Sequence, residues 1–210
     1  MIIYRFIYIL LLMLTEYRFY IKSNDNKKKY KYNSAGVCFY SDSDEIKIML
    51  LKKGSKKWEF LGGKVEKDDI SLLHTALREG VEESNGCITG INNSIELDFQ
   101  NIMNELISRN DTIYWYPYPK YNYGLFFIKI PNNMIHNSYT YGKTELFENQ
   151  KRTIHWLTVH EINNLINDKK NLNFEDDYFI LSKMESILKN PNNNKFLEKW
   201  EIIQNFEKNG

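Results

Sequence analysis

Residues 62–84 have the sequence GGKVEKDDISLLHTALREGVEES, and this stretch carries the pattern that decides the fold. The strand-like segment before it, WEFLGGKVE at residues 58–66, breaks at two glycines, where the backbone adopts conformations barred to other residues. Apolar residues then recur at helical spacing and predict one buried stripe, on a helix that Asp68 or Asp69 caps. The stretch therefore predicts a strand, a glycine turn, an acidic loop and a helix packed on a sheet.

Three glutamates, Glu79, Glu82 and Glu83, lie on the predicted helix. Because each helical residue advances by about 100°, the three side chains fall within an arc of about 100° and point to one side. Carboxylates so close together repel one another, and a hard divalent cation such as Mg²⁺ or Mn²⁺ removes that repulsion through oxygen ligands. The pattern indicates a metal site, against the alternative of a solvated acidic helix face.

The segment from Gly63 to Gly86 resembles the Nudix box, Gx5Ex7REUxEExGU, in which U is a bulky aliphatic residue. The matching positions are Gly63, Arg78, Glu79, Glu82 and Glu83. The resemblance implies an α+β fold, a Nudix-type α/β/α sandwich with a mixed central sheet and additional C-terminal helices. We expect a Nudix hydrolase domain over residues 15–190 and a C-terminal helix over residues 191–210.

Three features depart from the box. Asp69 replaces the loop glutamate, and eight residues in place of seven separate it from Arg78, a longer loop that resembles the coenzyme A diphosphatase branch. Gly80 replaces an aliphatic residue, which weakens a helix by up to ~1 kcal/mol relative to Ala. Asn85 stands where glycine is usual, and Asn also adopts the left-handed conformation needed at a helix end. None of these changes removes a glutamate from the predicted site.

The resemblance also implies roles for individual residues. The implied metal ligands are Glu79, Glu82, Glu83 and the carbonyl group of Gly62, and Arg78 reaches back to Asp69 and holds the loop in shape. The implied catalytic residues are Arg78, Glu79, Glu82, Glu83 and Glu148. Glu148 and Glu145 are candidates for the general base, against the alternative of ordinary loop acids. The expected substrate contacts are Gly62, Gly63, Lys64 and Tyr116, the last in an aromatic run suited either to base stacking or to core packing.

The expected function is divalent-metal-dependent hydrolysis of a diphosphate linkage in a nucleoside diphosphate derivative. The candidate substrates are a dinucleotide, a nucleotide sugar, coenzyme A and an RNA cap. A catalytically inactive Nudix-fold module that binds a nucleotide or a protein is the alternative. We expect a small-molecule nucleotide as the partner, with capped RNA and a homodimer as open alternatives, and neither DNA nor a membrane.

Composition bounds these interpretations. The 28 Lys and Arg residues against 27 Asp and Glu residues give a net charge of +1, which demands no nucleic-acid or membrane partner. Two cysteines without metal-ligand spacing are typical of a reducing compartment, so we expect a cytoplasmic protein. The apolar residues 1–14 are fewer than the ~20 that usually span a membrane, and they leave three alternatives: a signal peptide, an anchor, or an extension before a start at Met13.

Periodicity predicts the remaining elements. The expected strands are residues 15–23, 34–41, 45–53, 112–118, 123–130 and 151–159. The expected helices are residues 97–107, 160–168, 176–190 and 194–208.

Overall fold

The computed structural model describes most of the region from Phe19 to Asn167 and two short segments after it. The described residues are 19–22, 29–42, 44–54, 57–89, 94–109, 113–118, 121–145, 150–167, 185–189 and 198–199. The strands are β1 (Phe19–Lys22), β2 (Lys29–Tyr32), β3 (Ser34–Ser41), β4 (Lys47–Lys53), β5 (Lys57–Glu59), β6 (Leu61–Lys64), β7 (Tyr114–Tyr118), β8 (Tyr123–Lys129), β9 (Arg152–Thr158) and β10 (Glu198–Lys199). The helices are α2 (Leu72–Glu83), α3 (Ile95–Arg109), the 3-10 turn η2 (Asn132–Met134) and α4 (Val159–Asn167).

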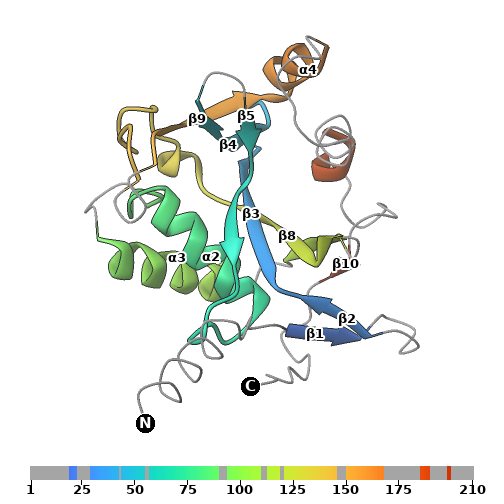
Figure 1. The fold of residues 1–210 in the computed structure, drawn as a ribbon. Helices are drawn as coiled ribbons and strands as arrows, with labels where there is room; N and C mark the ends of the chain where they lie inside the picture. The colour runs from blue at the N-terminus through green and yellow to red at the C-terminus, as the bar shows by residue number, and fades with distance from the viewer. Residues whose placement is uncertain are drawn as a thin grey trace.

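Strand β3 organises the main sheet (Figure 1). It pairs in parallel with β8 along most of its length, and on its other edge it pairs antiparallel first with β6 and then with β4. Strand β4 continues the sheet by pairing antiparallel with β5 and β9. The sheet is therefore mixed, as expected. The prediction that the strand breaks at Gly62 and Gly63 is wrong, because both glycines lie within β6 and pair with Gly36 and Ala35 of the central strand.

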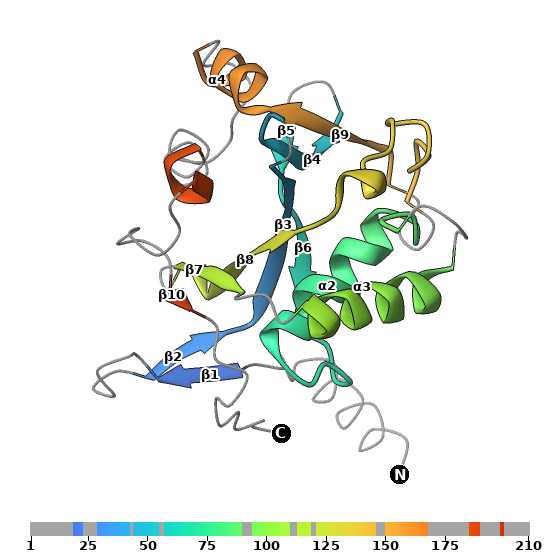
Figure 2. The ribbon, with the colours of Figure 1, turned by 180° about the vertical axis from the view of Figure 1, so that it is seen from behind.

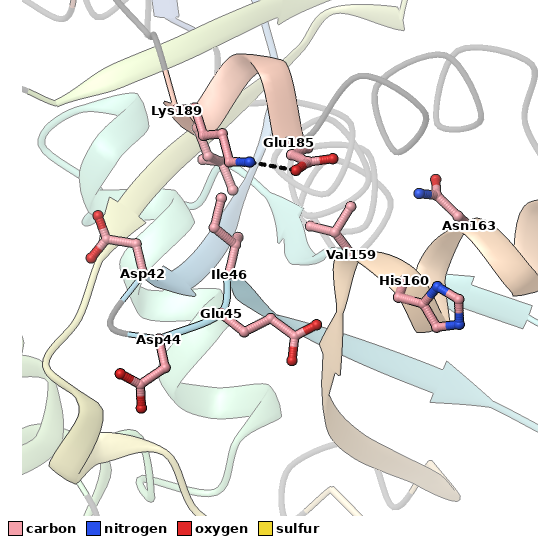
Figure 3. Close-up of a pocket in the computed structure, with 10 residues that line it drawn as sticks. Asp42, Asp44, Glu45, Ile46, Val159, His160, Asn163, Glu185 and Lys189 are labelled. Carbon is pink, nitrogen blue, oxygen red and sulfur yellow. Dashed lines mark hydrogen bonds and ion pairs between the residues drawn. The ribbon is translucent and has the colours of Figure 1, made fainter.

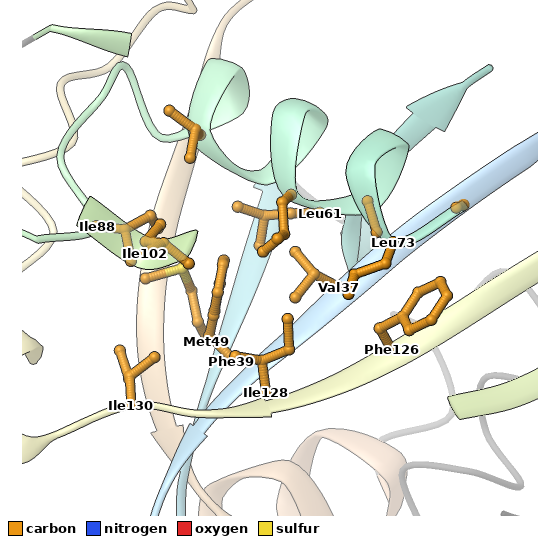
Figure 4. Packing of buried hydrophobic residues seen from close by; sticks show 14 of the residues in the cluster. Val37, Phe39, Met49, Leu61, Leu73, Ile88, Ile102, Phe126, Ile128 and Ile130 are labelled. Atoms are coloured by element: carbon orange, nitrogen blue, oxygen red, sulfur yellow. The ribbon is translucent and has the colours of Figure 1, made fainter. Parts of the chain in front are cut away.

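Both faces of this sheet are buried, because successive side chains of the central strands enter different hydrophobic clusters. On β3, Val37 and Phe39 belong to the cluster that includes residues of α2 and α3, whereas Cys38 belongs to the cluster that includes residues of α4. Figures 1 and 2 show these helices on opposite sides of the sheet, and Figure 4 shows the first cluster. The α/β/α sandwich is confirmed. Cys87 lies in the first cluster, so the two cysteines are separated by the sheet and form no disulfide.

Helix α2 begins later than expected. Ser71 is its N-cap, and the Ser71 hydroxyl accepts a hydrogen bond of 3.0 Å from the backbone N–H of His74. The prediction that Asp68 or Asp69 caps the helix is wrong, because the Asp69 carboxylate is engaged elsewhere. The helix ends at Glu83 with Ser84 as its C-cap. As predicted, Asn85 then adopts the left-handed conformation, with a φ of 60°, and its N–H donates to the carbonyl of Glu82.

The C-terminal predictions fare differently along the chain. Residues 185–189 are helical, in agreement with the helix expected at residues 176–190. The helix expected at residues 194–208 is wrong at Glu198–Lys199, because these two residues form β10 and pair with the open edge of β7. An edge strand offers backbone partners that override helical periodicity.

Other predictions lie outside the described residues. They are the apolar residues 1–14, the start at Met13, Glu148 and the remainder of residues 191–210. Among the described helices, none combines the length and the apolar character that crossing a membrane requires.

Packing explains why residue 80 is a glycine and not the aliphatic residue of the Nudix box. A Cβ atom at this position would lie 2.7 Å from Cγ1 of Val37 and 3.1 Å from Cε2 of Phe39, both on the central strand. The helix therefore approaches β3 more closely than an aliphatic side chain would permit. This close approach sets the height of α2 above the sheet.

We predict that Gly80→Ala lowers the free energy of unfolding by about 1–3 kcal/mol, because the added methyl group overpacks the contact with Val37. Helix propensity alone predicts the opposite sign, a gain of about 1 kcal/mol. Urea denaturation measures the difference. In a Val37→Ala background, where the opposing methyl groups are gone, the same substitution should cost markedly less. A stabilised Gly80→Ala variant would contradict the close packing of α2 on β3.

Candidate active site

Two glutamates of α2 lie against the two glycines of β6, Gly62 and Gly63. The carboxylate of Glu83 accepts a hydrogen bond of 2.8 Å from the backbone N–H of Gly62. The carboxylate of Glu79 lies over Gly63 so closely that a Cβ atom there would come within 2.4 Å of its Cδ atom. A side chain at position 63 would therefore displace the Glu79 carboxylate from its place over the strand.

Arg78 joins the acidic loop to the helix. Its Nε and Nη2 atoms donate to the two carboxylate oxygens of Asp69 at 3.0 and 3.1 Å, which is the contact that the resemblance implied. Nη2 also donates to the carbonyl of Lys64 at 2.8 Å. Nη1 pairs with Glu82 at 3.0 Å, and Nη2 lies 3.1 Å from Glu79. One planar guanidinium thus holds strand β6, the acidic loop and two of the three glutamates in a fixed arrangement.

Asp69 is almost completely buried, and its environment favours the charged form. Burial opposes the charge, but hydrogen bonds from His74, at 2.9 Å, and from Arg78 outweigh it and hold the pKa of the carboxyl group well below its usual range. The hydroxyl of Thr75 donates to the same carboxylate at 2.9 Å, and the N–H of Glu66 donates at 2.8 Å. The loop is therefore locked around a single buried anion.

The pKa values of Glu79 and Glu83 are shifted in the opposite direction from that of Asp69. Burial raises the pKa of each carboxyl group to about 7, and for Glu79 the neighbouring charge of Glu82 adds to the effect of burial. Arg78 acts against the shift at Glu79, and Lys53 acts against it at Glu83. Burial also raises the pKa of Glu82. The surroundings of all three glutamates therefore disfavour the charged form of the carboxyl group, chiefly through burial.

Lys53 is a member of the site that the sequence analysis missed. Its Nζ atom lies 3.4 Å from Glu83 and 3.4 Å from Glu59, and it brings the end of β4 to the acidic helix. Lys53 stands beside Lys52 at the end of an apolar strand. Nothing in that pattern separates an active-site lysine from a solvated one, because the pairing depends on the approach of a helix distant in sequence.

The predicted site residues are brought together only in part. The carboxylates of Glu79 and Glu83 both lie against the glycines of β6, whereas the Glu82 carboxylate pairs with Arg78. Within the described part of the chain, no three acidic, histidine or cysteine side chains form a group arranged to hold a metal ion. The Lys64 side chain is exposed, and only its carbonyl group has a described contact, with Arg78.

Tyr116 and the loop acids lie elsewhere. Tyr116 packs at a ring distance of 4.4 Å on Tyr118, in the cluster on the opposite face of the sheet from α2. Glu145 is buried, and its charge contributes to the raised pKa of Glu83. Glu148 is outside the described residues. Of the two loop acids, the structure therefore relates Glu145 to the helix glutamates.

The chemistry of the donor set fits a divalent cation. Glu79, Glu82 and Glu83 offer carboxylate oxygens of the kind that Mg²⁺ and Mn²⁺ prefer, on one side of one helix. Burial raises the pKa values of Glu79 and Glu83, and a bound divalent cation would lower them again by favouring the charged carboxylates.

A cavity lies at the other end of the sheet (Figure 3). It measures about 570 Å³ and is bounded by the turn after β3, the start of α4 and the helical residues 185–189. Its walls include Asp44, His160 and the ion pair between Glu185 and Lys189. None of the predicted site residues lines it, so size alone does not identify the active site.

A family model and several solved structures are similar to this chain. The chain is similar to a solved NUDIX hydrolase from Alicyclobacillus acidocaldarius, with 13% identity and a TM-score of 0.45 over 74% of this chain and 91% of that chain. It is also similar to the Ap4A hydrolase of C. elegans, with 15% identity and a TM-score of 0.39 over 74% of this chain and 96% of that chain. No curated protein matches the sequence. A family model described as the NUDIX domain matches residues 31–180, more than half of the 210 residues, and the chain therefore belongs to the NUDIX family.

Proposed function

We propose that the protein is a divalent-metal-dependent hydrolase that cleaves a diphosphate linkage in a nucleoside diphosphate derivative. Membership of the NUDIX family supports pyrophosphohydrolase activity in general. The observation that carries the finer proposal is the pair of buried carboxylates, Glu79 and Glu83, pressed against the Gly62 and Gly63 backbone with their pKa values raised to about 7. Buried carboxyl groups with strongly perturbed pKa values are typical of functional sites.

Each residue of the site has a distinct proposed role. Glu79, Glu82 and Glu83 would hold Mg²⁺ or Mn²⁺, which when bound polarises a phosphoryl oxygen, activates water and neutralises the leaving phosphate. Arg78 and Asp69 position the turn and the helix relative to each other through their paired hydrogen bonds. Lys53 orients Glu83 and adds positive charge where a phosphate approaches. Most of the catalytic effect would then come from placement and electrostatics.

A binding module without hydrolytic activity is the second candidate. One observation favours it: in the described structure, Glu79 and Glu82 are paired with Arg78 and Glu83 with Lys53, so all three acids already have a cationic partner. Such pairing is compatible with a stable acidic surface that never recruits a metal. The presence of all three acids on the helix beside the glycines of β6 supports the hydrolase. A measurement of substrate turnover distinguishes the two candidate functions.

We predict that Glu83→Gln lowers kcat by at least about a hundredfold in the presence of Mn²⁺, because it removes a metal ligand that also accepts from Gly62. Glu79→Gln should have a comparable effect. Product release is measured with ADP-ribose, NADH, coenzyme A, dinucleoside polyphosphates and capped RNA, with Mg²⁺ or Mn²⁺ in each assay.

Glu96→Gln is the matched control, since Glu96 is an exposed helical glutamate in the first turn of α3. It should retain wild-type turnover. Equal turnover by wild type and Glu83→Gln would remove the proposed catalytic role. Nucleotide binding without product, for every substrate and both metals, would instead favour the binding module.

We also predict that, in a chelator, the free energy of unfolding falls as the pH rises from about 5 to about 7.5, by on the order of a few kcal/mol. The pKa values of Glu79 and Glu83 are about 7 in the folded protein against 4.5 for the unperturbed group. Between these values the folded protein keeps protons that the unfolded chain has released. The stabilisation is therefore complete below about 4.5 and is lost as the pH approaches 7.

Urea denaturation at each pH tests this dependence. The double variant Glu79→Gln/Glu83→Gln should show a flatter profile, whereas Glu96→Gln should follow the wild type. Mn²⁺ should stabilise the wild type more at about pH 7.5 than at about pH 5, because ligands must be deprotonated to bind it. A profile that the double variant leaves unchanged would show that these two carboxyl groups are not responsible.

A further inference from the structure

The turn at residues 141–144 lies against the C-terminal end of α2. The side-chain amide of Asn85 donates to the carbonyl groups of Tyr141 and Thr144 at 2.9 and 3.0 Å. Only 7% of Asn85 is exposed, so these hydrogen bonds are shielded from water. The amide sits so far into the turn that a Cβ atom on Gly142 would lie 3.3 Å from its Nδ2 atom. The turn is therefore tied to the helix that carries the glutamates.

Asn85 stands where the Nudix box has glycine, and it does more than a glycine could. With a φ of 60°, its backbone takes the left-handed conformation that glycine usually supplies at a helix end. A glycine would end the helix equally well, but it has no side chain and would leave the carbonyl groups of Tyr141 and Thr144 without these hydrogen bonds. The tether to the turn, and not the end of the helix, is therefore what the asparagine adds.

Glu145 follows the turn directly, and its backbone is fixed on the side of β9. The N–H of Glu145 donates to the carbonyl of Gln150 at 3.0 Å, and the N–H of Arg152 donates to the carbonyl of Lys143 at 3.0 Å. These contacts pair the end of the turn with the start of β9. Since Thr144 accepts from Asn85, the residue before Glu145 is also joined to α2.

Arg152 holds the same turn from the sheet. It is the register partner of Lys53 in the pairing of β9 with β4. Its Nη1 atom donates to the carbonyl groups of Tyr141 and Gly142 at 2.8 and 3.0 Å. The carbonyl of Tyr141 thus accepts from both Arg152 and Asn85. The turn is attached at two points, one on the sheet and one on the acidic helix.

This attachment brings Glu145 into the surroundings of Glu83, which precedes Asn85 by two residues. Glu83, Glu145 and Arg152 are all buried. Burial raises the pKa of Glu83, and the charge of Glu145 adds to that effect. Burial lowers the pKa of Arg152, and the charges of Glu145 and Glu83 act against that shift. With little water between these groups, their interaction depends strongly on how they are placed.

We propose that Asn85 is a positioning residue: its side-chain amide holds the 141–144 turn on the end of α2 and thereby places Glu145 to act as the general base beside Glu83. This inference rests on the proposed hydrolase function. As general base, the Glu145 carboxylate takes one proton from the water whose oxygen attacks phosphorus, while the bridging oxygen leaves with the electrons of the broken P–O bond. Proton transfer requires close alignment, so releasing the turn slows this step without removing a substrate contact.

The test replaces Asn85 with glycine, which keeps the left-handed backbone and removes only the amide. Asn122→Gly is the matched control, because Asn122 also has a positive φ, 52°, and lies between β7 and β8. Kinetics are measured with Mn²⁺ on whichever compound the wild type hydrolyses fastest among ADP-ribose, NADH, coenzyme A, diadenosine tetraphosphate and capped RNA. We expect Asn85→Gly to lower kcat about tenfold and to change KM less than about twofold. Asn122→Gly should match the wild type.

A double-mutant cycle with Glu145→Gln shows whether Asn85 acts through this acid. Glu145→Gln alone should lower kcat by at least about a hundredfold. In that background, Asn85→Gly should lower kcat less than about twofold further, because the base that it displaces is already absent. Equal factors in both backgrounds would show a general structural effect and overturn the proposal. An unchanged kcat in either single variant would overturn it as well.

Hydrogen exchange in a chelator tests the tether without turnover. The N–H groups of Glu145 and Arg152 should exchange at least about fivefold faster in Asn85→Gly, while those of α2 keep their wild-type rates and show that the fold is intact. Unchanged exchange at Glu145 and Arg152 would contradict the tether. If the wild type hydrolyses none of the five compounds and exchange is still faster, Asn85 holds the turn, but its catalytic role fails together with the proposed function.

Discussion

The pairing of Arg78 with the buried carboxylate of Asp69 is the interaction on which the rest of the site depends. Removing one partner of a buried ion pair leaves an uncompensated charge and typically costs about 3–5 kcal/mol. Here the same guanidinium also contacts the Lys64 carbonyl, Glu79 and Glu82, so its position sets theirs. The acidic loop, strand β6 and helix α2 are therefore held in fixed positions relative to one another. The relative positions of the glutamates follow from an interaction that need not touch the substrate.

Local pattern was enough to predict most of the sheet and the main helix. Strands β3, β4 and β8 are rich in apolar and β-branched residues, and the buried stripe of α2 has helical spacing, so packing and propensity agree there. The contact between Arg78 and Asp69 followed from the family motif. Glu198–Lys199 was predicted as helix but pairs with β7, because the unpaired edge of a strand is a tertiary feature that no local period encodes.

The parts that the sequence could not reveal are those made by distant segments. Lys53 meets Glu83 because β4 ends beside the helix, and Arg152 meets Lys53 through strand register. His74 and Thr75 are ordinary helical residues until the loop folds Asp69 back onto them. Gly80 weakens the helix when it is considered alone and permits close packing when β3 is present. In each case a residue's role is set by a neighbour whose position only the folded chain defines.

The register between Lys53 and Arg152 also bears on how the protein assembles during synthesis. The acidic helix packs on β3 and β6, which precede it closely in the chain, so its contacts are available soon after residue 83 leaves the ribosome. The pairing of β4 with β9 joins positions about a hundred residues apart and waits for a much longer nascent chain. The acidic helix can therefore pack on β3 and β6 before β9 has been synthesised.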